Sequence, residues 1–462
     1  MTYHVAIDIG ASSGRVILAK KENGLQLEEI HRFRNGFTEV DGHYRWDIDN
    51  LVDNVLIGLE KVKKSGVSTC TIGIDTWAVD YVLLDDKGQL LGQPIAYRDS
   101  RTQGTMEQVF HHIPKETIYQ KTGIQFLNFN TLYQLFVEDK VLLEKTEKIL
   151  MIPDYIAYKL TGRMAGEVTN WSTTQFLNFE TRQYDADLVN LLQIEPEKFP
   201  ELIEAGDIIG PLQVSGYDLP EAQVIAVGTH DTASAVVGVP ATSENWAYIS
   251  SGTWSLIGVE ANQPIANQDS FEANYTNEWG AYQTYRFLKN ITGMWCVQEI
   301  ARLTNYQYSF KEMAEQAAQV TPFQQVIDLN DDRFTNPDNM IEEIQLACRE
   351  TGQPVPETIG ELVMAVYSNL AKAYGRELKM LEELTGQTID CLHIVGGGSN
   401  ISLLNQLTAN VIGKEIVAGP GEATAIGNIL IQMITTGKFE NLAQARKWLA
   451  STSCFEAYIP QT

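Results

Sequence analysis

The sequence has few cysteines, and they are too widely spaced to form a covalent or metal-binding framework. The five are Cys70, Cys296, Cys348, Cys391 and Cys454. Their number is odd, and no CxxC pair occurs. Disulfide scaffolds and structural zinc sites both depend on paired or clustered cysteines. We therefore expect neither, and we predict five reduced thiols that act as packing residues.

Long hydrophobic runs are also missing. No segment reaches the roughly 18 consecutive apolar residues that indicate a membrane-spanning helix. The opening residues, MTYHVAIDIGASSGRVILAKK, place Asp8 inside their apolar run and include no basic leader, unlike a secretory signal peptide. The prediction is a cytoplasmic protein that is neither exported nor inserted in a membrane.

Positive charge is scarce. The chain has 34 Lys and Arg residues against 59 Asp and Glu residues, for a formal net charge of −25. Such a field repels phosphate backbones and anionic lipids, so we expect no nucleic-acid or membrane partner. A nucleotide site would need backbone amides and a bound cation to offset the charge locally. The sequence leaves the oligomeric state open.

Low-complexity linkers are absent as well. The chain of 462 residues is about three times the size of a typical domain, so at least two domains are expected. Strand-like runs at 71–75 and 79–84 alternate with helical patterns at 50–64 and 361–384. This alternation predicts an α/β fold whose domains pack closely enough to share one cleft.

Two strand–turn–strand patterns lie about half the chain apart. Residues 3–8 and 14–18 flank a turn of Gly, Ala and Ser, and residues 246–249 and 254–259 flank a turn of Ser, Gly and Thr. We interpret each as a hairpin with a small-residue turn. A repeat on this scale predicts two similar lobes, each with a turn of the size that binds a phosphate.

The boundary between the lobes is expected near residue 240. Residues 238–245, GVPATSEN, have the composition of a turn-rich connection. We therefore divide the chain into an N-terminal lobe at 1–240 and a C-terminal lobe at 241–462.

Both small-residue turns are candidate phosphate sites. In DIGASSGR, Asp8 ends a strand beside a turn whose backbone N–H groups could face an anion. The alternative is an ordinary tight hairpin, because short Gly and Ser motifs recur by chance. In SSGT, at 250–253, the same arrangement adds the hydroxyl of Thr253, which suits contact with a β- or γ-phosphate.

A third glycine-rich segment follows a buried-strand pattern. LHIVGGGSN, at 392–400, ends its strand with three glycines and leads into a helix with Leu403, Leu404 and Leu407 on one side. These glycines could let a flat group approach the backbone. The spacing is not GxGxxG, which disfavours a dinucleotide site, and a close strand-to-helix turn is the alternative.

One aspartate stands where a general base is expected. GTHDTASA, at 228–235, follows the apolar run 224–227 and places Asp231 where a strand would open into a cleft. Phosphoryl transfer to a hydroxyl needs a carboxylate that accepts the hydroxyl proton. Asp231 could equally cap the following helix, because Asp before Thr and small residues is a common capping pattern.

Segments that mix polar and aromatic residues are candidate sugar contacts. IDTWAVD, at 74–80, and YRDSRT, at 97–102, occur where strands end, and Asn290 and Gln298 flank Trp295. Pockets that bind small molecules have this mixture. Core packing, surface ion pairs and ordinary helix polarity are the alternatives.

Taken together, these motifs resemble one known family. DIGASSGR, IDTWAVD, GTHDTASA, SSGTWSL and IVGGGSN occur in the order seen in the FGGY carbohydrate kinases. The resemblance covers nearly the whole chain. It implies the actin, hexokinase and Hsp70 fold group, with two ribonuclease-H-like lobes and with ATP and a sugar bound in the interdomain cleft.

The resemblance also implies roles for individual residues. Asp231 would be the catalytic proton acceptor, and Asp8 would help to hold Mg²⁺. The N-terminal lobe would carry the base, the first phosphate turn and the sugar site, and the C-terminal lobe would carry the second phosphate turn and the adenosine site. The sugar would contact Ala78, His230, Asp231, Thr232 and Asn290. ATP would contact Ala11, Ser12, Ser13, Gly14, Arg15, Thr253, Gln298 and Gly397.

Four further segments narrow the substrate. AYRDSRT (96–102), GIQFLNFNTLYQL (123–135), LKNITGMW (288–295) and NDDRFTNP (330–337) are similar to one branch of this family. That branch transfers the γ-phosphate of ATP to the 1-hydroxyl of L-rhamnulose in L-rhamnose degradation, and it often has Gly at the position of Ala78. A kinase for L-fuculose or a xylulose, and a non-catalytic ATP-binding regulator, are the alternatives.

Overall fold

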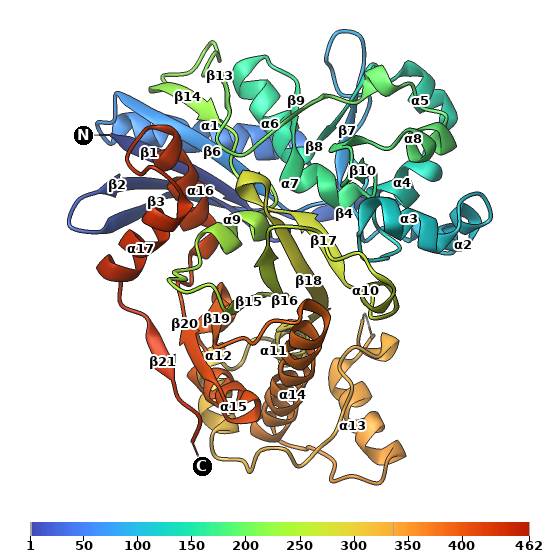
Figure 1. Ribbon diagram of the computed structural model, residues 1–462, viewed down its shortest axis with the longest axis vertical. Coiled ribbons are helices and arrows are strands. Elements are labelled where there is room, and N and C mark those ends of the chain that lie inside the picture. Colours follow the sequence, from blue (N-terminus) through green and yellow to red (C-terminus); the bar gives the residue numbers. More distant parts are fainter. Residues whose placement is uncertain (1, 336, 462) are drawn as a thin grey trace. The chain divides into compact units, whose positions relative to one another are not determined.

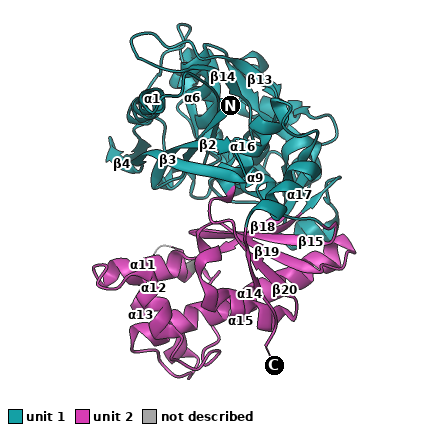
Figure 2. Ribbon diagram, turned by 90° about the vertical axis from the view of Figure 1, so that its left-hand side faces the viewer, with its two compact units in different colours: residues 1–242, 260–287, 424–453 teal, residues 243–259, 288–423, 454–462 magenta. Residues whose placement is uncertain are grey.

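The computed structural model describes residues 2–335 and 337–461. Residue 336, in the segment 330–337 named above, lies outside the described residues. The chain divides into two compact units, which Figure 2 colours separately. Unit 1 comprises residues 1–242, 260–287 and 424–453, and unit 2 comprises residues 243–259, 288–423 and 454–462. Neither unit is one continuous stretch of sequence.

Unit 1 contains a six-stranded mixed sheet with the strand order β13-β14-β6-β1-β2-β3. The central strand β1 forms an antiparallel hairpin with β2 and pairs in parallel with β6. Strand β14 is parallel to β6, and β13 pairs with it in the antiparallel direction. The strands are β1 (Tyr3–Ile9), β2 (Ser13–Lys21), β3 (Leu25–Arg34), β6 (Thr69–Thr76), β13 (Ile208–Pro211) and β14 (Glu221–Ile225).

A second sheet, most of it in unit 2, repeats this plan over six of its strands in the order β18-β16-β15-β19-β20-β21. Strand β15 forms an antiparallel hairpin with β16 and pairs in parallel with β19. The hairpins β1–β2 and β15–β16 therefore occupy the same place in two sheets of the same order, which confirms the predicted internal repeat. The strands are β15 (Trp246–Ser251), β16 (Trp254–Ala261), β18 (Tyr285–Thr292), β19 (Cys391–Val395), β20 (Glu415–Ala418) and β21 (Glu456–Tyr458).

Shorter strands form two-stranded ribbons or extend a sheet edge. The pairs are β4 with β5, β7 with β8, β9 with β12 and β10 with β11, and β17 lies next to β18. Their bounds are β4 (Phe37–Val40), β5 (His43–Trp46), β7 (Tyr81–Leu84), β8 (Lys148–Met151), β9 (Ala165–Glu167), β10 (Leu177–Asn178), β11 (Gln183–Tyr184), β12 (Glu201–Ile203) and β17 (Thr276–Trp279).

The helices of unit 1 come from three parts of the chain. They are α1 (Ile48–Lys64), α2 (Thr105–Phe110), α3 (Lys115–Thr122), α4 (Thr131–Phe136), α5 (Lys140–Lys145), α6 (Ile152–Thr161), α7 (Val168–Trp171), α8 (Ala186–Leu192), α9 (Asp231–Val237), α10 (Gln268–Glu272), α16 (Ala423–Thr435, all but its first residue in this unit) and α17 (Leu442–Thr452). Unit 2 contains α11 (Trp295–Leu303), α12 (Phe310–Ala317), α13 (Met340–Glu350), α14 (Ile359–Thr385) and α15 (Ser402–Ile412).

The helices predicted at 50–64 and 361–384 are α1 and α14, and local capping explains their ends. Asp47 accepts a hydrogen bond from the Asn50 backbone N–H at the start of α1. At the start of α14, Thr358 and Glu361 form a reciprocal capping box. Gly386 ends α14 at a positive φ of 67°, a conformation that glycine adopts at little cost.

Helix α16 lies beside the first sheet although it comes from near the end of the chain (Figure 1). Thr71 Oγ1 donates to Gln432 Oε1 at 2.6 Å, across 361 positions of sequence. Gln432 Nε2 in turn donates to the backbone oxygen of Val5 at 3.0 Å. A side chain at Gly73 would collide with Asn428, since its Cβ would lie 2.2 Å from Asn428 Oδ1. Buried polar contacts therefore assign α16 to unit 1.

Arg446, on α17, holds two further segments in unit 1. Its Nη1 donates to Glu260 Oε2 at 2.6 Å, just beyond the boundary at which the chain re-enters the unit. Its Nη2 donates to Val236 O at 2.7 Å, at the end of α9. Because one guanidinium offers several fixed donors, it can join segments that are far apart in sequence.

The structure agrees with the expectation that the cysteines are reduced. All five cysteines, each within the described residues, are free thiols, as predicted. None of the helices in residues 2–335 and 337–461 combines the length and the apolar character that crossing a membrane requires.

Candidate active site

The first small-residue turn joins β1 to β2 and is held by polar contacts. Asp8 and Arg15 face each other in the hairpin, and Arg15 Nη2 donates to Asp8 Oδ2 at 2.6 Å. The backbone N–H of Gly10 donates to Ser13 O at 2.9 Å and closes the turn. Asp8 is buried. The predicted phosphate turn, which begins at Ala11, therefore lies next to the residue expected to hold Mg²⁺.

Two neighbours of this turn were missed by sequence reasoning. Asn35 Nδ2 donates to Gly10 O at 2.8 Å, and the Asn35 backbone N–H donates to Ser12 O at 3.0 Å. Gly14 packs against the ring of Phe33, which would lie only 2.1 Å from a Cβ at that position. Asn35 and Phe33 reach the turn only because β3 pairs with β2. A single sequence gives no local signal for such a pairing.

Asp75 is a third carboxylate of the site, and sequence reasoning included it only as part of the candidate sugar segment at 74–80. It pairs with Asp8 in the β1–β6 register and is fully buried. Asn428 Nδ2 donates to its Oδ2 at 2.6 Å, and its Oδ1 has no hydrogen-bond partner among the described residues. Burial, followed by the charge of Asp8, raises the pKa of Asp75 well above its usual value. An unsatisfied buried oxygen of this kind indicates a place for a ligand or ion.

Asp231 is the first residue of α9, so it is not the helix cap. The N-cap is His230, and the Asp231 carboxylate instead accepts a hydrogen bond from Thr232 Oγ1 at 3.1 Å. The Asp231 side chain is 33% exposed, in contrast to the buried Asp8 and Asp75. The capping alternative is therefore wrong, and the carboxylate is accessible to a substrate hydroxyl.

The loop that precedes Asp231 is anchored by the buried Glu167. Glu167 Oε2 accepts hydrogen bonds from the backbone N–H and the Oγ1 of Thr229, at 3.0 and 2.8 Å. The Thr229 carbonyl oxygen accepts the backbone N–H of Thr76 at 2.9 Å. Burial raises the pKa of Glu167 to about 7, although these hydrogen bonds favour its ionised form. The loop that leads to Asp231 is therefore fixed at Thr229 by hydrogen bonds on both its N–H and its carbonyl side.

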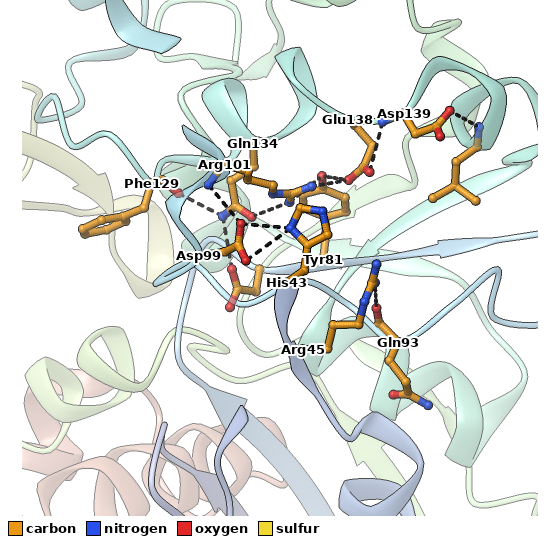
Figure 3. A network of polar contacts seen from close by, with 12 residues as sticks. His43, Arg45, Tyr81, Gln93, Asp99, Arg101, Phe129, Gln134, Glu138 and Asp139 are labelled. Atoms are coloured by element: carbon orange, nitrogen blue, oxygen red, sulfur yellow. Dashed lines mark hydrogen bonds and ion pairs between the residues drawn. The ribbon is translucent and has the colours of Figure 1, made fainter. Parts of the chain in front are cut away.

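The candidate sugar segment at 97–102 is tied into a buried polar network (Figure 3). Arg101 donates to Glu138 Oε2 at 2.8 Å and to Gln134 Oε1 at 3.0 Å. Tyr81 OH donates to the same Glu138 oxygen at 2.6 Å. The Arg101 and Glu138 side chains are only 9% and 8% exposed. Arg101 and Glu138 therefore form a buried ion pair, not the surface ion pair of the alternative interpretation.

The segment at 74–80 joins the same network through Asp80. Trp46 and Trp77 donate their indole N–H groups to Asp80 Oδ2 at 2.7 and 3.0 Å, and Gln134 donates to Oδ1 at 3.1 Å. Burial raises the pKa of Asp80 to about 6 despite these donors. Ala78 lies between these anchored residues and is partly exposed. It is the predicted sugar contact of this segment.

The second small-residue turn, in unit 2, is bound to the start of α11. The backbone N–H of Met294 donates to Gly252 O at 2.9 Å, and Thr253 Oγ1 donates to Gln298 Oε1 at 3.2 Å. Gly293 makes this approach possible, because a Cβ there would lie 2.6 Å from the Trp254 backbone. Two predicted ATP contacts, Thr253 and Gln298, are thus neighbours.

The glycine-rich turn after β19 packs against the same hairpin. A Cβ at Gly398 would lie 2.0 Å from Ser251 Oγ, and one at Gly396 would lie 2.9 Å from Ser251 O. Gly396 also has a positive φ of 80°. Gly396 and Gly398 therefore allow the close strand-to-helix turn that was the alternative interpretation of this segment. Gly397 makes no such approach and faces a cavity.

That cavity has a volume of about 680 Å³ and lies wholly within unit 2. Gly252, Gln298 and Gly397 line it together with the exposed face of α12 and the start of α15. Its volume is in the range of about 300 to 1,000 Å³ that small-molecule sites occupy. Its remaining lining residues are Met294, Phe310, Lys311, Ala314, Glu315, Ala318, Gly398, Asn400, Ile401, Ser402 and Leu403.

The predicted site residues fall into two groups, one in each unit. Unit 2 holds Thr253, Asn290, Gln298 and Gly397, of which Asn290 lies on β18 and is partly exposed. Unit 1 holds Asp8, Ala11, Ser12, Ser13, Gly14, Arg15, Ala78, His230, Asp231 and Thr232.

Comparison with known proteins identifies the family. Residues 3–238 match the N-terminal domain of the FGGY family of carbohydrate kinases, and residues 247–436 match its C-terminal domain. The chain belongs to the FGGY family. The family prediction is therefore confirmed, and with it the assignment of the chain to ATP-dependent carbohydrate kinases.

Individual relatives are similar over their full length. A rhamnulokinase of Ligilactobacillus salivarius is 54% identical and one of Lactiplantibacillus plantarum is 52% identical, each covering 100% of this chain and 96% of the relative. The ligand-bound xylulose kinase from Lactobacillus acidophilus superposes with a TM-score of 0.81 at 16% identity, covering 100% of this chain and 94% of that one. This likeness confirms the predicted two-lobed α/β fold of FGGY kinases.

Gly397 and Gly398 offer a matched test of the glycine-rich turn. A Cβ at Gly398 collides with Ser251, whereas one at Gly397 meets no described atom within 4 Å. We expect Gly398→Ala to cost about 1 to 3 kcal/mol of unfolding free energy, as overpacking does, and Gly397→Ala to cost little. Urea unfolding of both variants measures the difference. Equal losses would contradict the packing described here.

Glu167 predicts a pH-dependent stability. Its pKa rises from the usual 4.5 to about 7 on folding, so the folded protein holds this proton more tightly than the unfolded chain does. This contribution is complete below pH 4.5 and falls by up to about 3 kcal/mol as the pH rises to about 7. Glu167→Gln keeps an acceptor for Thr229 and should flatten that slope. Measurements of the unfolding free energy of both proteins across this pH range give the two slopes. An unchanged slope in Glu167→Gln would refute the assignment of this pH dependence to Glu167.

Proposed function

We propose that this FGGY kinase transfers the γ-phosphate of ATP to the 1-hydroxyl of L-rhamnulose, giving L-rhamnulose 1-phosphate and ADP in L-rhamnose degradation. Identities of 52% and 54% to full-length relatives named rhamnulokinase support this substrate. The structural observation that carries the chemistry is Asp231, an accessible carboxylate at the start of α9 on an anchored loop. Such a pathway step uses cytoplasmic ATP, so we place the protein in the cytoplasm.

The cavity of unit 2 is the proposed adenosine site. Its volume of about 680 Å³ suits a nucleoside, and Gln298 and Gly397 line it. Thr253, hydrogen-bonded to Gln298, would then contact the phosphates with its hydroxyl. We accordingly assign the second phosphate turn and the adenosine site to the C-terminal lobe, 241–462.

Mg²⁺ is the expected partner of the ATP phosphates, and the carboxylates of Asp8 and Asp75 are suited to bind it. Within the described part of the chain, no three His, Cys, Asp or Glu side chains gather as a metal cluster. Mg²⁺ needs none, because it usually takes one or two carboxylates together with water and substrate phosphates. Asp8 and Asp75 are paired in register, and Asp75 Oδ1 is buried without a hydrogen-bond partner among the described residues. We assign these two carboxylates to Mg²⁺, which would neutralise phosphate charge.

Asp231 is the proposed general base. It would accept the proton of the sugar 1-hydroxyl as that oxygen bonds to the γ-phosphorus. The bond from phosphorus to the bridging oxygen breaks, and ADP leaves with the electron pair. The backbone amides from Ala11 to Arg15 would orient the phosphates. Ala78, His230, Thr232 and Asn290 would contact the sugar, which assigns most of the sugar site to the N-terminal lobe, 1–240.

ADP release with a panel of sugars tests both the reaction and the substrate. Purified protein with MgATP should release ADP with L-rhamnulose above the rate without sugar, and more slowly with L-fuculose, L-xylulose and D-xylulose. Addition of EDTA should abolish the release. Preference for another ketose would keep the mechanism and change the substrate. No sugar-dependent release with any of the four would refute the kinase assignment in favour of an ATP-binding regulator.

Asp231→Asn tests the base. Loss of the proton acceptor should lower kcat by roughly 10² to 10⁴-fold, the usual contribution of a general base, while ATP still binds. Asp86→Asn, which removes the same charge from an exposed turn, is the matched control and should keep full turnover. Coupled ADP assays and calorimetric ATP titrations measure the two properties. Turnover by Asp231→Asn equal to that of the control would remove Asp231 from the mechanism.

A further inference from the structure

A buried ion pair lies behind His230, the residue before the proposed base. Arg286 Nη1 is 2.9 Å from Glu278 Oε2, and Arg286 Nη2 is 3.1 Å from His230 Nδ1. On the other side of the ring, His230 Nε2 is 3.4 Å from Asp231 Oδ1. Arg286 is fully buried and Glu278 is 6% exposed. The four side chains are connected by close contacts from Glu278 to Asp231 within unit 1.

The direction of one hydrogen bond determines where His230 carries its proton. A guanidinium has only donors, so Arg286 Nη2 donates and His230 Nδ1 accepts. Glu278 Oε2 also lies 3.3 Å from Nδ1, but among the described residues it accepts no hydrogen bond of good geometry. A neutral imidazole whose Nδ1 accepts carries its proton on Nε2. Nε2 is the nitrogen next to Asp231.

We propose that Arg286 and Glu278 are positioning residues for the transfer reaction, because they hold His230 as an Nε2–H donor beside Asp231. The inference rests on the proposed role of Asp231 as the base. The donor steadies the ionised Asp231 carboxylate in one orientation before it takes the hydroxyl proton. Arg286 and Glu278 themselves touch neither the sugar nor the nucleotide in this assignment.

A purely structural ion pair is the competing explanation. A buried pair by itself is weak evidence for stability, because the cost of removing two charges from water offsets their attraction. Here Glu278 compensates the charge of Arg286, the Arg286 Nε donates to Trp279 O at 3.2 Å, and the remaining terminal nitrogen is directed at the imidazole. Because this donor binds a ring nitrogen of His230, the residue next to the proposed base, an orienting role is favoured.

The charged groups around His230 define what the loss of Arg286 would change. Asp231, Glu278 and Arg286 face the ring, and Glu167 binds the adjoining Thr229. Without Arg286, Glu278 would remain beside Nδ1, 3.3 Å away, as an acceptor for a proton on that nitrogen. Loss of Arg286 should therefore favour the Nδ1–H tautomer, which leaves no proton on Nε2 to donate to Asp231.

The tautomer of His230 can be read without any turnover. The chain has seven histidines, and ¹⁵N NMR of protein labelled at the imidazole nitrogens distinguishes the Nδ1–H, Nε2–H and doubly protonated forms. The signals that disappear in His230→Gln identify this residue. We expect the Nε2–H form in the wild type at neutral pH. An Nδ1–H or doubly protonated ring would overturn the proposal.

Arg286→Met tests the consequence for catalysis. We expect an Nδ1–H signal for His230, a fall in kcat of about 10- to 100-fold, as when an orienting partner is removed, and an unchanged KM for ATP. The double variant Arg286→Met/Glu278→Gln removes the carboxylate that would accept the Nδ1 proton, and it should recover part of kcat and the Nε2–H signal.

Arg446→Met is the matched control. Arg446 is also buried and paired with a glutamate in unit 1, but its other donors bind the carbonyls of Val236 and Val237. This variant should lose stability without any change in the His230 signal or in kcat. If neither arginine variant changes the His230 signal, the pair is only structural and the proposal is wrong.

Two outcomes keep this inference separate from the proposed function. If the wild type releases no ADP with any sugar, the function fails, while the NMR result still decides the tautomer. If the wild type is active and Arg286→Met keeps its kcat and its Nε2–H signal, only the positioning role fails. Should Arg286→Met not fold, the wild-type tautomer remains decisive, because an Nδ1–H ring is incompatible with donation from Arg286.

Discussion

Acidic side chains gather where β1 and β6 end, and holding them together is the constraint on which unit 1 depends. Asp8 and Asp75 are paired across adjacent strands, and burial and mutual repulsion raise the pKa of Asp75. Arg15 offsets the charge from the hairpin, and Asn428 donates a hydrogen bond from α16. Because Asn428 comes from near the end of the chain, this cluster is complete only after α16 has packed on the sheet.

The same constraint explains the polar interior around α16. A carboxylate without fixed donors would be costly to bury, so its partner must itself be held. Gln432 Nε2 donates to Asn428 Oδ1 at 2.7 Å, and Thr71 donates to Gln432 at 2.6 Å. Gly73 leaves the space that Asn428 needs. Each contact supports the next, and together they orient the Asp75 carboxylate.

The two sheets contain equivalent hairpins whose turns have different surroundings. In the first, the turn is flanked by Asp8 and Arg15, which are charged and paired. In the second, the turn carries the neutral Thr253 and packs against α11 beside a cavity. The repeated backbone supplies the same small-residue turn in both units, while the side chains around it differ. This difference is the basis of our proposal that one unit binds the cation and the other the nucleoside.

Asp231 illustrates where sequence reasoning reached its limit. The residues GTHDTASA allowed both a base and a helix cap, and both are compatible with a strand followed by a helix. The structure places His230 at the cap and leaves the Asp231 side chain 33% exposed. Whether Asp231 caps the helix depends on the backbone dihedral angles of His230 and Asp231, which the residue types alone do not specify.

By itself, the sequence determined the features whose interactions are local. The small-residue turns, the hairpins around them, the helices with their caps and the family motifs all depend on residues close together in the chain. Only the tertiary structure decided which distant polar groups complete the site. Asn428 reaches Asp75 across 353 positions, and Arg286 reaches His230 across 56. A hydrogen bond needs its two heavy atoms about 3 Å apart, and that proximity exists only once the strands have paired and the helices have packed on them.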